Sequence, residues 1–173
     1  MDGMPTFRAA RPEAAPPGPG QESVWDYPRP PACVPSARMI EVRRRGALIA
    51  RSSAALRILE TSHPPTWYLP PDAVEPDRLV RSAARSTFCE WKGWAAYWDV
   101  VDGDGRVEAA AWSYEAPSPG FEQIAGYLAF DPRQLECFVD GERARPQPGR
   151  FYAGWITDDV VGPFKGIPGS QGW

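Results

Sequence analysis

The sequence predicts a mainly β domain. Short segments rich in aliphatic and aromatic residues recur along the chain, typically every ~8–12 residues. Glycine and proline turn signals separate them, and the 173 residues include 16 glycines and 21 prolines. No repeat of fixed period stands out. With 43% hydrophobic residues the chain can bury the core of one domain.

Residues 38–60 are expected to form three of these strands. Ile40 and Val42 alternate with Met39, Glu41 and Arg43, which places both aliphatic side chains on one face of a strand. Gly46 marks a hairpin turn, and "ALRILE" (55–60) continues the alternation. A further strand is expected over "TWYLP" (66–70), which ends at a proline pair.

The following half of the chain continues this pattern with short helical turns. Asp72 and Asp77 are candidate caps for one turn each, and another short helix is expected after Ser118. Two β segments, separated at Lys92, are expected before the tight turn "DGDG" (102–105). Residues 106–115 are expected to form the strand that pairs with the second segment across this turn. Residues 135–145 predict a second hairpin, and the last part of the chain predicts one strand followed by a Gly/Pro-rich tail.

Three regions follow from this pattern. Residues 1–22 are rich in Pro, Ala and Gly and predict a disordered tail, because they offer too little apolar surface to order themselves. Residues 23–167 form the expected single domain, which opens with an extended proline-rich path over 23–35. Residues 168–173 form a C-terminal tail.

Composition narrows the expected partners. The net charge of −3 and pI of about 5.3 give no general attraction for nucleic acid or an anionic membrane. No run of roughly twenty apolar residues and no signal-peptide core is present, so we expect a cytoplasmic protein without membrane partners. Cys33, Cys89 and Cys137 lack Cys-x-x-Cys spacing, so neither a disulfide framework nor a metal site is expected, and no cofactor is indicated.

Almost all of the basic residues are arginine. Of 19 basic residues only Lys92 and Lys165 are lysine, and both sit in an aromatic-Lys-Gly sequence. Lysine is a compact point charge whereas arginine is a planar fork, so some sites require one and not the other. The alternative is that both are ordinary solvated turn lysines.

Six segments in order resemble the bacterial family known as domain of unknown function 427: "VWDYPRPP", "LETSHPPTWYLPPDAV", "TFCEWKGWAAYWDV", "AAWSYEAP", "IAGYLAFDP" and "GWITDDVVGPFKG". The resemblance covers residues 23–166, although Glu90 stands where family members usually have proline. It implies a small Mss4-like (β-tent) architecture. Some relatives in that wider group bind zinc through two Cys-x-x-Cys pairs, which this chain lacks.

A nucleotidyltransferase label attached to the family finds little support in the sequence. The chain has neither a Walker A motif nor GxGxxG. Asp158 and Asp159 are adjacent and would face opposite sides of a strand, and Asp102-x-Asp104 fits a hairpin turn better than a magnesium site. The resemblance alone therefore implies no activity.

The only histidine, His63, lies in "ETSHPPTWYLP" and is a candidate general base. Pro64 forces His63 away from the α region, and Glu60 could orient its ring. An enzyme of transferase or hydrolase type would pair His63 with Cys89 or Glu60. The alternatives are a histidine hydrogen-bonded within a rigid turn and an inert cysteine packed among aromatics.

The leading hypothesis is a small-molecule-binding protein with an aromatic-lined cleft, since eight tryptophans are many for packing alone. Lys92 would bind an anionic group of the ligand, and His63 would supply a hydrogen bond. A third hypothesis is a protein-interaction module that docks through "DYPRPP" (26–31). The sequence does not indicate an oligomeric state. The residues expected to bind the ligand are Glu60, His63, Tyr68, Trp91, Lys92, Trp98, Trp112, Tyr114 and Trp155.

Overall fold

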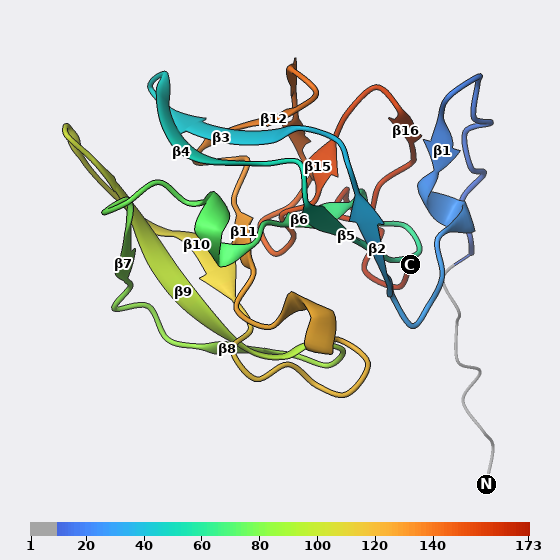
Figure 1. Ribbon diagram of the computed structural model, residues 1–173. Coiled ribbons are helices and arrows are strands. Elements are labelled where there is room, and N and C mark those ends of the chain that lie inside the picture. Colours follow the sequence, from blue (N-terminus) through green and yellow to red (C-terminus); the bar gives the residue numbers. More distant parts are fainter. Residues whose placement is uncertain (1–9) are drawn as a thin grey trace, which may run out of the picture.

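The computed structural model describes residues 10–173 and confirms a mainly β protein with short 3-10 turns. The largest sheet is antiparallel, with the order β11-β10-β9-β7, and β8 pairs with one end of β9. It occupies the lower left of Figure 1. Its strands are β7 (Leu79–Arg81), β8 (Thr87–Cys89), β9 (Gly93–Asp102), β10 (Gly105–Ser113) and β11 (Leu128–Phe130).

A four-stranded antiparallel sheet with the order β13-β12-β3-β4 lies along the top of Figure 1. A three-stranded sheet, β2-β5-β6, joins the largest sheet through paired backbone hydrogen bonds of 2.8 Å between Leu69 and Leu128. The strands are β3 (Ile40–Arg44), β4 (Ala47–Ser52), β12 (Glu136–Val139) and β13 (Glu142–Arg143), then β2 (Ala32–Ser36), β5 (Ala55–Leu59) and β6 (Thr66–Tyr68).

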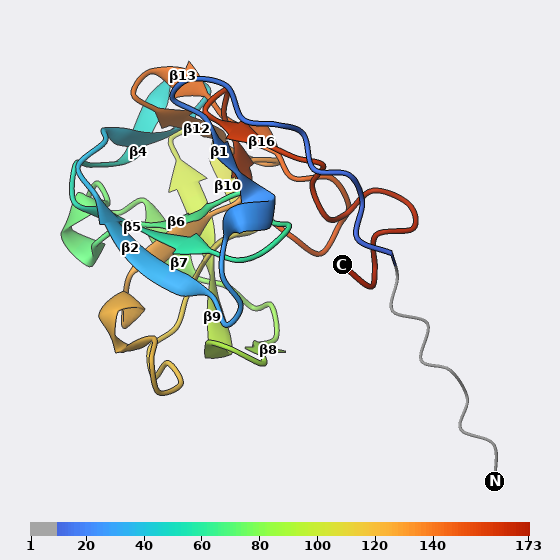
Figure 2. The ribbon, with the colours of Figure 1, turned by 90° about the vertical axis from the view of Figure 1, so that its right-hand side faces the viewer.

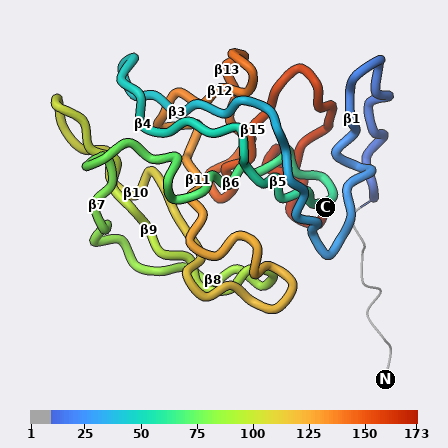
Figure 3. Tube along the Cα trace, in the orientation of Figure 1, coloured from blue at the N-terminus to red at the C-terminus, as the bar shows by residue number. Residues whose placement is uncertain are grey.

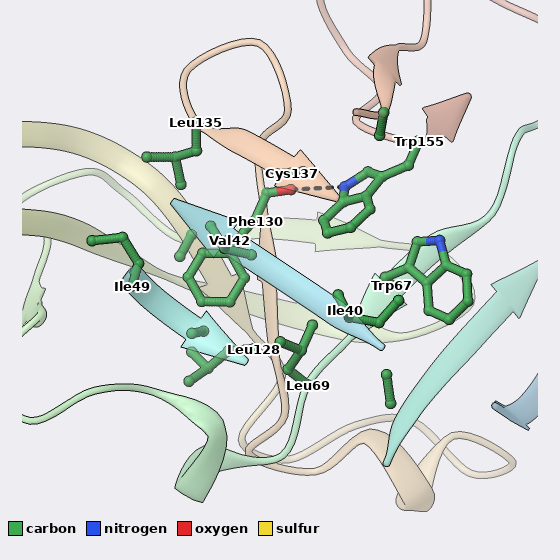
Figure 4. Packing of buried hydrophobic residues seen from close by; sticks show 14 of the residues in the cluster. Ile40, Val42, Ile49, Trp67, Leu69, Leu128, Phe130, Leu135, Cys137 and Trp155 are labelled. Carbon is green, nitrogen blue, oxygen red and sulfur yellow. Dashed lines mark hydrogen bonds between the residues drawn. The ribbon is translucent and has the colours of Figure 1, made fainter. Parts of the chain in front are cut away.

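Figure 2 shows the four-stranded sheet and the largest sheet in a second view. The side chains of the main core pack between these two sheets (Figure 4). Ile40 and Val42 face it, as their alternation predicts, and both are fully buried. Trp155, on β15 (Trp155–Ile156), is 1% exposed, and its indole Nε1–H donates a 3.1 Å hydrogen bond to the carbonyl oxygen of Phe130. β15 pairs with β14 (Arg145–Pro146). A smaller cluster around Tyr68, Tyr114 and Phe121 packs between the three-stranded and largest sheets.

The two ends of the described chain lie side by side (Figure 3). β1 (Glu22–Ser23) pairs in parallel with β16 (Val160–Val161). Trp25, in the short 3-10 helix η1 (Val24–Asp26), donates a 2.9 Å hydrogen bond from Nε1 to Pro163 and packs edge-on against Trp173. The N-terminal and C-terminal segments therefore hold each other against the domain.

The expected tails contain more structure than the sequence suggests. Residues 1–9 of the expected disordered region lie outside the described residues. Within residues 10–22, the Ala15 amide donates to Gly162, and Gln21 donates through its side chain to Asp158. At the other end Ser170 is buried and Trp173 contacts Trp25.

Most of the predicted elements are confirmed. The hairpins at Gly46, "DGDG" and Asp140–Gly141 form, as do single turns at η2 (Pro71–Ala73) and η3 (Glu122–Ile124). The second expected turn, after Asp77, is wrong: β7 begins at Leu79, because its residues pair along β9. The single final strand is also wrong, since β15 and β16 pair with different partners. The β-tent arrangement implied by the resemblance stays a prediction.

Trp155 offers a test of this core. Replacing Trp155 with phenylalanine removes the indole N–H and leaves the buried carbonyl oxygen of Phe130 without that donor. We expect the free energy of unfolding to fall by about 1–3 kcal/mol, the usual cost of an unsatisfied buried group. Urea unfolding followed by far-ultraviolet circular dichroism measures the change. Trp94→Phe is the matched control, because Trp94 is 64% exposed, and it should change the stability by less than about 0.5 kcal/mol. Equal effects of the two substitutions would contradict this description of the core.

Candidate functional site

A cleft of about 600 Å³ opens between the three-stranded sheet, the β8–β9 connection and the C-terminal segment. The corner after β5 contributes Glu60 and His63, and the aromatic wall comes from β9, β10 and their neighbours. The segment between β14 and the C-terminus contributes Gln147, Tyr152 and Lys165. The remaining lining residues are Ile58, Pro64, Thr66, Thr87, Phe88, Cys89, Glu90, Trp91, Lys92, Tyr97, Ala109, Trp112, Tyr114, Arg133, Arg150, Phe151 and Ala153.

Lys92 is half-buried in the turn between β8 and β9. Its Nζ lies 5.8 Å from the centroid of the Tyr68 ring and 5.5 Å from that of Tyr114, so two aromatic faces hold the ammonium. Burial lowers the pKa of Lys92, but the nearby Tyr68, Cys89 and Glu60 raise it, and the net shift is upward. No carboxylate of residues 10–173 lies within ion-pair distance of Lys92. Its positive charge is therefore available to the cleft.

Lys165 reaches the same cleft from the C-terminal segment. Its backbone N–H donates to Ser62 at 2.9 Å, which fixes the segment beside the histidine turn. Its Nζ donates to the main-chain oxygen of Trp173 at 3.1 Å and lies 5.7 Å from the Tyr152 ring centroid. Both lysines of the chain therefore line one cavity, although they lie far apart in sequence.

The charged side chains around the cleft are not balanced. Four basic residues line it against two acidic ones, which are Glu60 and Glu90. Glu60 already pairs with Arg29 at 3.3 Å, and Arg133 with Asp131 at 3.0 Å. Lys165 donates to the Trp173 oxygen, so Lys92 and Arg150 are left opposite Glu90, with Lys165 beside them. A cleft lined mainly by one sign of charge concentrates ligands of the opposite sign. This one is positive on a protein whose net charge is negative.

His63 lies at the rigid corner that its proline neighbours predict. Its backbone N–H donates to Glu60 at 3.0 Å across a turn in which Ser62 adopts a φ of 73°. The ring packs edge-on against Tyr152 with centroids 4.8 Å apart. Its Nδ1 lies 3.0 Å from Nε2 of Gln147, and its Nε2 lies 3.5 Å from Oε2 of Glu60.

The surroundings of His63 favour its neutral form. Burial is the main cause, followed by Lys165, Arg29 and Lys92, and together they lower the pKa of His63 to about 4. His63 is therefore neutral at physiological pH. It also shares no hydrogen bond with Cys89 among the described residues, although both line the cleft.

The aromatic side chains form much of the opposite wall. Trp91, Tyr97, Trp112 and Tyr114 line the cleft, and Trp112 donates through Nε1 to the Tyr68 hydroxyl at 3.4 Å. Burial raises the pKa of Tyr114, so its hydroxyl stays protonated. The wall therefore offers flat apolar faces and neutral hydroxyl groups.

The structure brings together six of the nine residues expected to bind a ligand: Glu60, His63, Trp91, Lys92, Trp112 and Tyr114. Tyr68 lies behind this wall, fully buried and in contact with Lys92 and Trp112. Trp155 is in the main core instead, because its indole is needed there to satisfy Phe130. Trp98 packs against the same core, with Arg81 over its ring at 4.5 Å.

Sequence reasoning left several lining residues out of the site, among them Gln147, Tyr152 and Lys165. Lys165 had a usable signal, since it shares the rare aromatic-Lys-Gly pattern with Lys92. Gln147 and Tyr152 lie in the irregular segment between β14 and β15, where no local pattern reveals a long-range contact.

The other candidate sites are explained by ion pairs or turns. Asp158 pairs with Arg145 at 2.9 Å and Asp159 with Arg38 at 2.5 Å, so the two carboxylates bind arginines on different segments. Asp102 accepts from the Asp104 amide within the hairpin turn. Residues 10–173 contain no group of three or more His, Cys, Asp or Glu side chains arranged to hold a metal ion. Within the same range, no helix has the length and apolar character needed to span a membrane.

Proline-rich residues 26–31 are only partly available for docking. Tyr27 is 8% exposed, and its hydroxyl donates to Glu22 at 2.7 Å. Pro28, Arg29 and Pro30 are exposed, and Arg29 donates to Glu60 and Thr61 at the edge of the histidine turn. This segment therefore supports the corner that carries His63.

The lowered pKa of His63 makes stability depend on pH. The unfolded chain binds a proton on this ring near pH 6.5, whereas the folded protein does so only near pH 4. The contribution is complete above pH 6.5 and is lost as the pH falls toward 4, amounting to about 3 kcal/mol. Urea unfolding of the wild type and of His63→Asn, which cannot titrate here, measures it. Parallel stability curves for the two proteins between pH 7 and 4 would contradict this prediction.

Comparison with known proteins identifies the family of this chain. A search of curated proteins found no match. Residues 32–141 match the family model described as Domain of unknown function (DUF427). Gln147, Tyr152 and Lys165 lie after the matched residues, whereas Glu60, His63 and Lys92 lie within them. Because the match covers more than half of the chain, this protein belongs to the DUF427 family.

Proposed function

We propose that this protein binds a small organic anion with a planar apolar body in the cleft. The observation that carries the proposal is the placement of Lys92 and Lys165. The chain uses arginine for its other 17 basic residues, yet both lysines line one cavity. A compact ammonium can approach a carboxylate or phosphate as a point charge in a space where a planar guanidinium would not fit.

The remaining walls suit the rest of such a ligand. Trp91, Trp112 and Tyr97 present flat surfaces that can stack on a planar group. His63 is neutral and half-buried at the edge of the cleft, where it can contribute a hydrogen bond without adding charge. The volume of about 600 Å³ falls within the range of small-molecule sites.

Binding explains the site better than nucleophilic catalysis does. A cysteine–histidine enzyme requires an imidazole that accepts the thiol proton. Here His63 makes no hydrogen bond to Cys89 within residues 10–173, and its Nδ1 contacts Gln147 instead. The cleft therefore presents an arrangement for holding charge and aromatic surface.

Calorimetric titration with matched probes tests the proposal. Indole-3-carboxylate and phenyl phosphate should bind at least about tenfold more tightly than neutral indole-3-carboxamide, because only the anions pair with both lysines. Lys92→Met and Lys165→Met should each weaken binding of the anions about tenfold, equivalent to ~1.4 kcal/mol.

Arg51→Met is the matched control, since it removes one positive charge from an exposed position on β4 away from the cleft. It should leave the dissociation constants unchanged within about twofold. Equal affinity for the amide and the carboxylate, no binding of either anion to the folded protein, or unchanged binding in both lysine variants would overturn the proposal.

A further inference from the structure

We propose that Gln147 is a positioning residue that determines which ligand group the cleft accepts. It holds His63 in the tautomer whose Nε2–H is a hydrogen-bond donor. The site therefore accepts a deprotonated carboxylate or phosphate oxygen next to Nε2 and disfavours a ligand group that would itself donate a hydrogen bond there. This inference rests on the proposed function and adds the chemistry of the contact with His63.

The Gln147 side chain is held in one orientation by two backbone groups. Gln147 is 2% exposed, and its Oε1 accepts a 3.1 Å hydrogen bond from the Gly154 amide. Its Nε2 donates to the carbonyl oxygen of Lys165 at 2.9 Å. Rotating the amide by 180° would place the amino group against an N–H and the oxygen against a carbonyl, which would lose both bonds. The position of its nitrogen is therefore determined.

The orientation of Gln147 determines the tautomer of His63. One hydrogen on Nε2 of Gln147 is used by Lys165, and the other points to Nδ1 of His63, 3.0 Å away. Nδ1 must then be the unprotonated nitrogen that accepts this hydrogen bond. The neutral ring consequently carries its hydrogen on Nε2. Protonating Nδ1 as well would bring two donors together, which agrees with the neutral state of His63 that burial already favours.

The Nε2–H group of His63 is positioned for a ligand acceptor. Oε2 of Glu60 lies 3.5 Å from this nitrogen, which is longer than an ordinary hydrogen bond. That oxygen also faces Arg29 at 3.3 Å. Because His63 and the two lysines line the same cleft, an anionic oxygen among them would meet one neutral donor and two ammonium groups. A ligand group that donates a hydrogen bond would face the Nε2–H donor of His63 and find no acceptor there.

The first readout requires no ligand. His63 is the only histidine, so two-bond ¹H–¹⁵N correlation spectra of the folded protein contain one set of imidazole signals. At pH 7 the wild type should show the Nε2–H tautomer. Gln147→Glu should convert it to Nδ1–H or to the imidazolium, because a carboxylate accepts where the amide donates. Gln147→Met should leave the tautomers mixed. Gln123→Glu adds the same charge on an exposed residue and should retain Nε2–H.

The second readout is the affinity for phenyl phosphate. Gln147→Glu should lower it at least tenfold and Gln147→Met, which adds no charge, at least threefold, whereas Gln123→Glu should change it less than twofold. In the wild type, the Nε2 proton should shift and exchange more slowly with water when phenyl phosphate binds. This measurement decides the question even where a Gln147 variant does not fold.

The outcomes separate the two proposals. An Nδ1–H tautomer or an imidazolium in the wild type at pH 7 overturns the role of Gln147. So does an anion that binds the wild type without perturbing the Nε2 proton, or a folded Gln147→Met that keeps both the tautomer and the affinity. A wild type that shows Nε2–H but binds neither anion of the calorimetric panel overturns the proposed function, and the ligand class with it, while leaving the tautomer assignment correct.

Discussion

The arrangement of the cleft depends on one buried amide, that of Gln147. Its three hydrogen bonds reach Gly154, Lys165 and His63, and so join three segments that meet at one corner of the cleft. Two glycines allow the close approach. A Cβ atom at Gly154 would lie 2.6 Å from the Pro64 oxygen, and one at Gly166 would lie 1.8 Å from the Pro148 oxygen. A larger residue at Gly154 would push its segment away from the histidine turn, and one at Gly166 would push the lysine-bearing segment away from Pro148.

The ends of the chain take part in this arrangement. The segment that carries Lys165 is held from outside by Trp25, through its hydrogen bond to Pro163 and its contact with Trp173. The short parallel pair β1–β16 adds a second connection. These contacts lie outside residues 32–141, the part of the chain that matches the family. The matched part thus supplies His63 and Lys92, and the flanking segments position their partners.

The sequence predicts local structure far better than convergence of distant segments. Alternation at Ile40 and Val42 and the turns at Gly46 and "DGDG" depend on near neighbours, so the strands and hairpins could be predicted. The rarity of lysine and the rigid proline corner pointed to Lys92 and His63. Nothing local distinguishes Trp155, which fills the core, from Trp112, which lines the cleft. Gln147 was beyond prediction, because its role arises from contacts with residues up to 84 positions away.

The central claim is that the walls of this cleft converge to hold an anion. Anomalous diffraction from crystals soaked in molybdate, a tetrahedral oxoanion, tests it directly, because the heavy atom reports its own position. We predict the strongest anomalous peak inside the cleft, within ion-pair distance of the Nζ atoms of Lys92 and Lys165 and beside Nε2 of His63. Peaks only at exposed arginines elsewhere on the protein, with none in the cleft, would contradict the account.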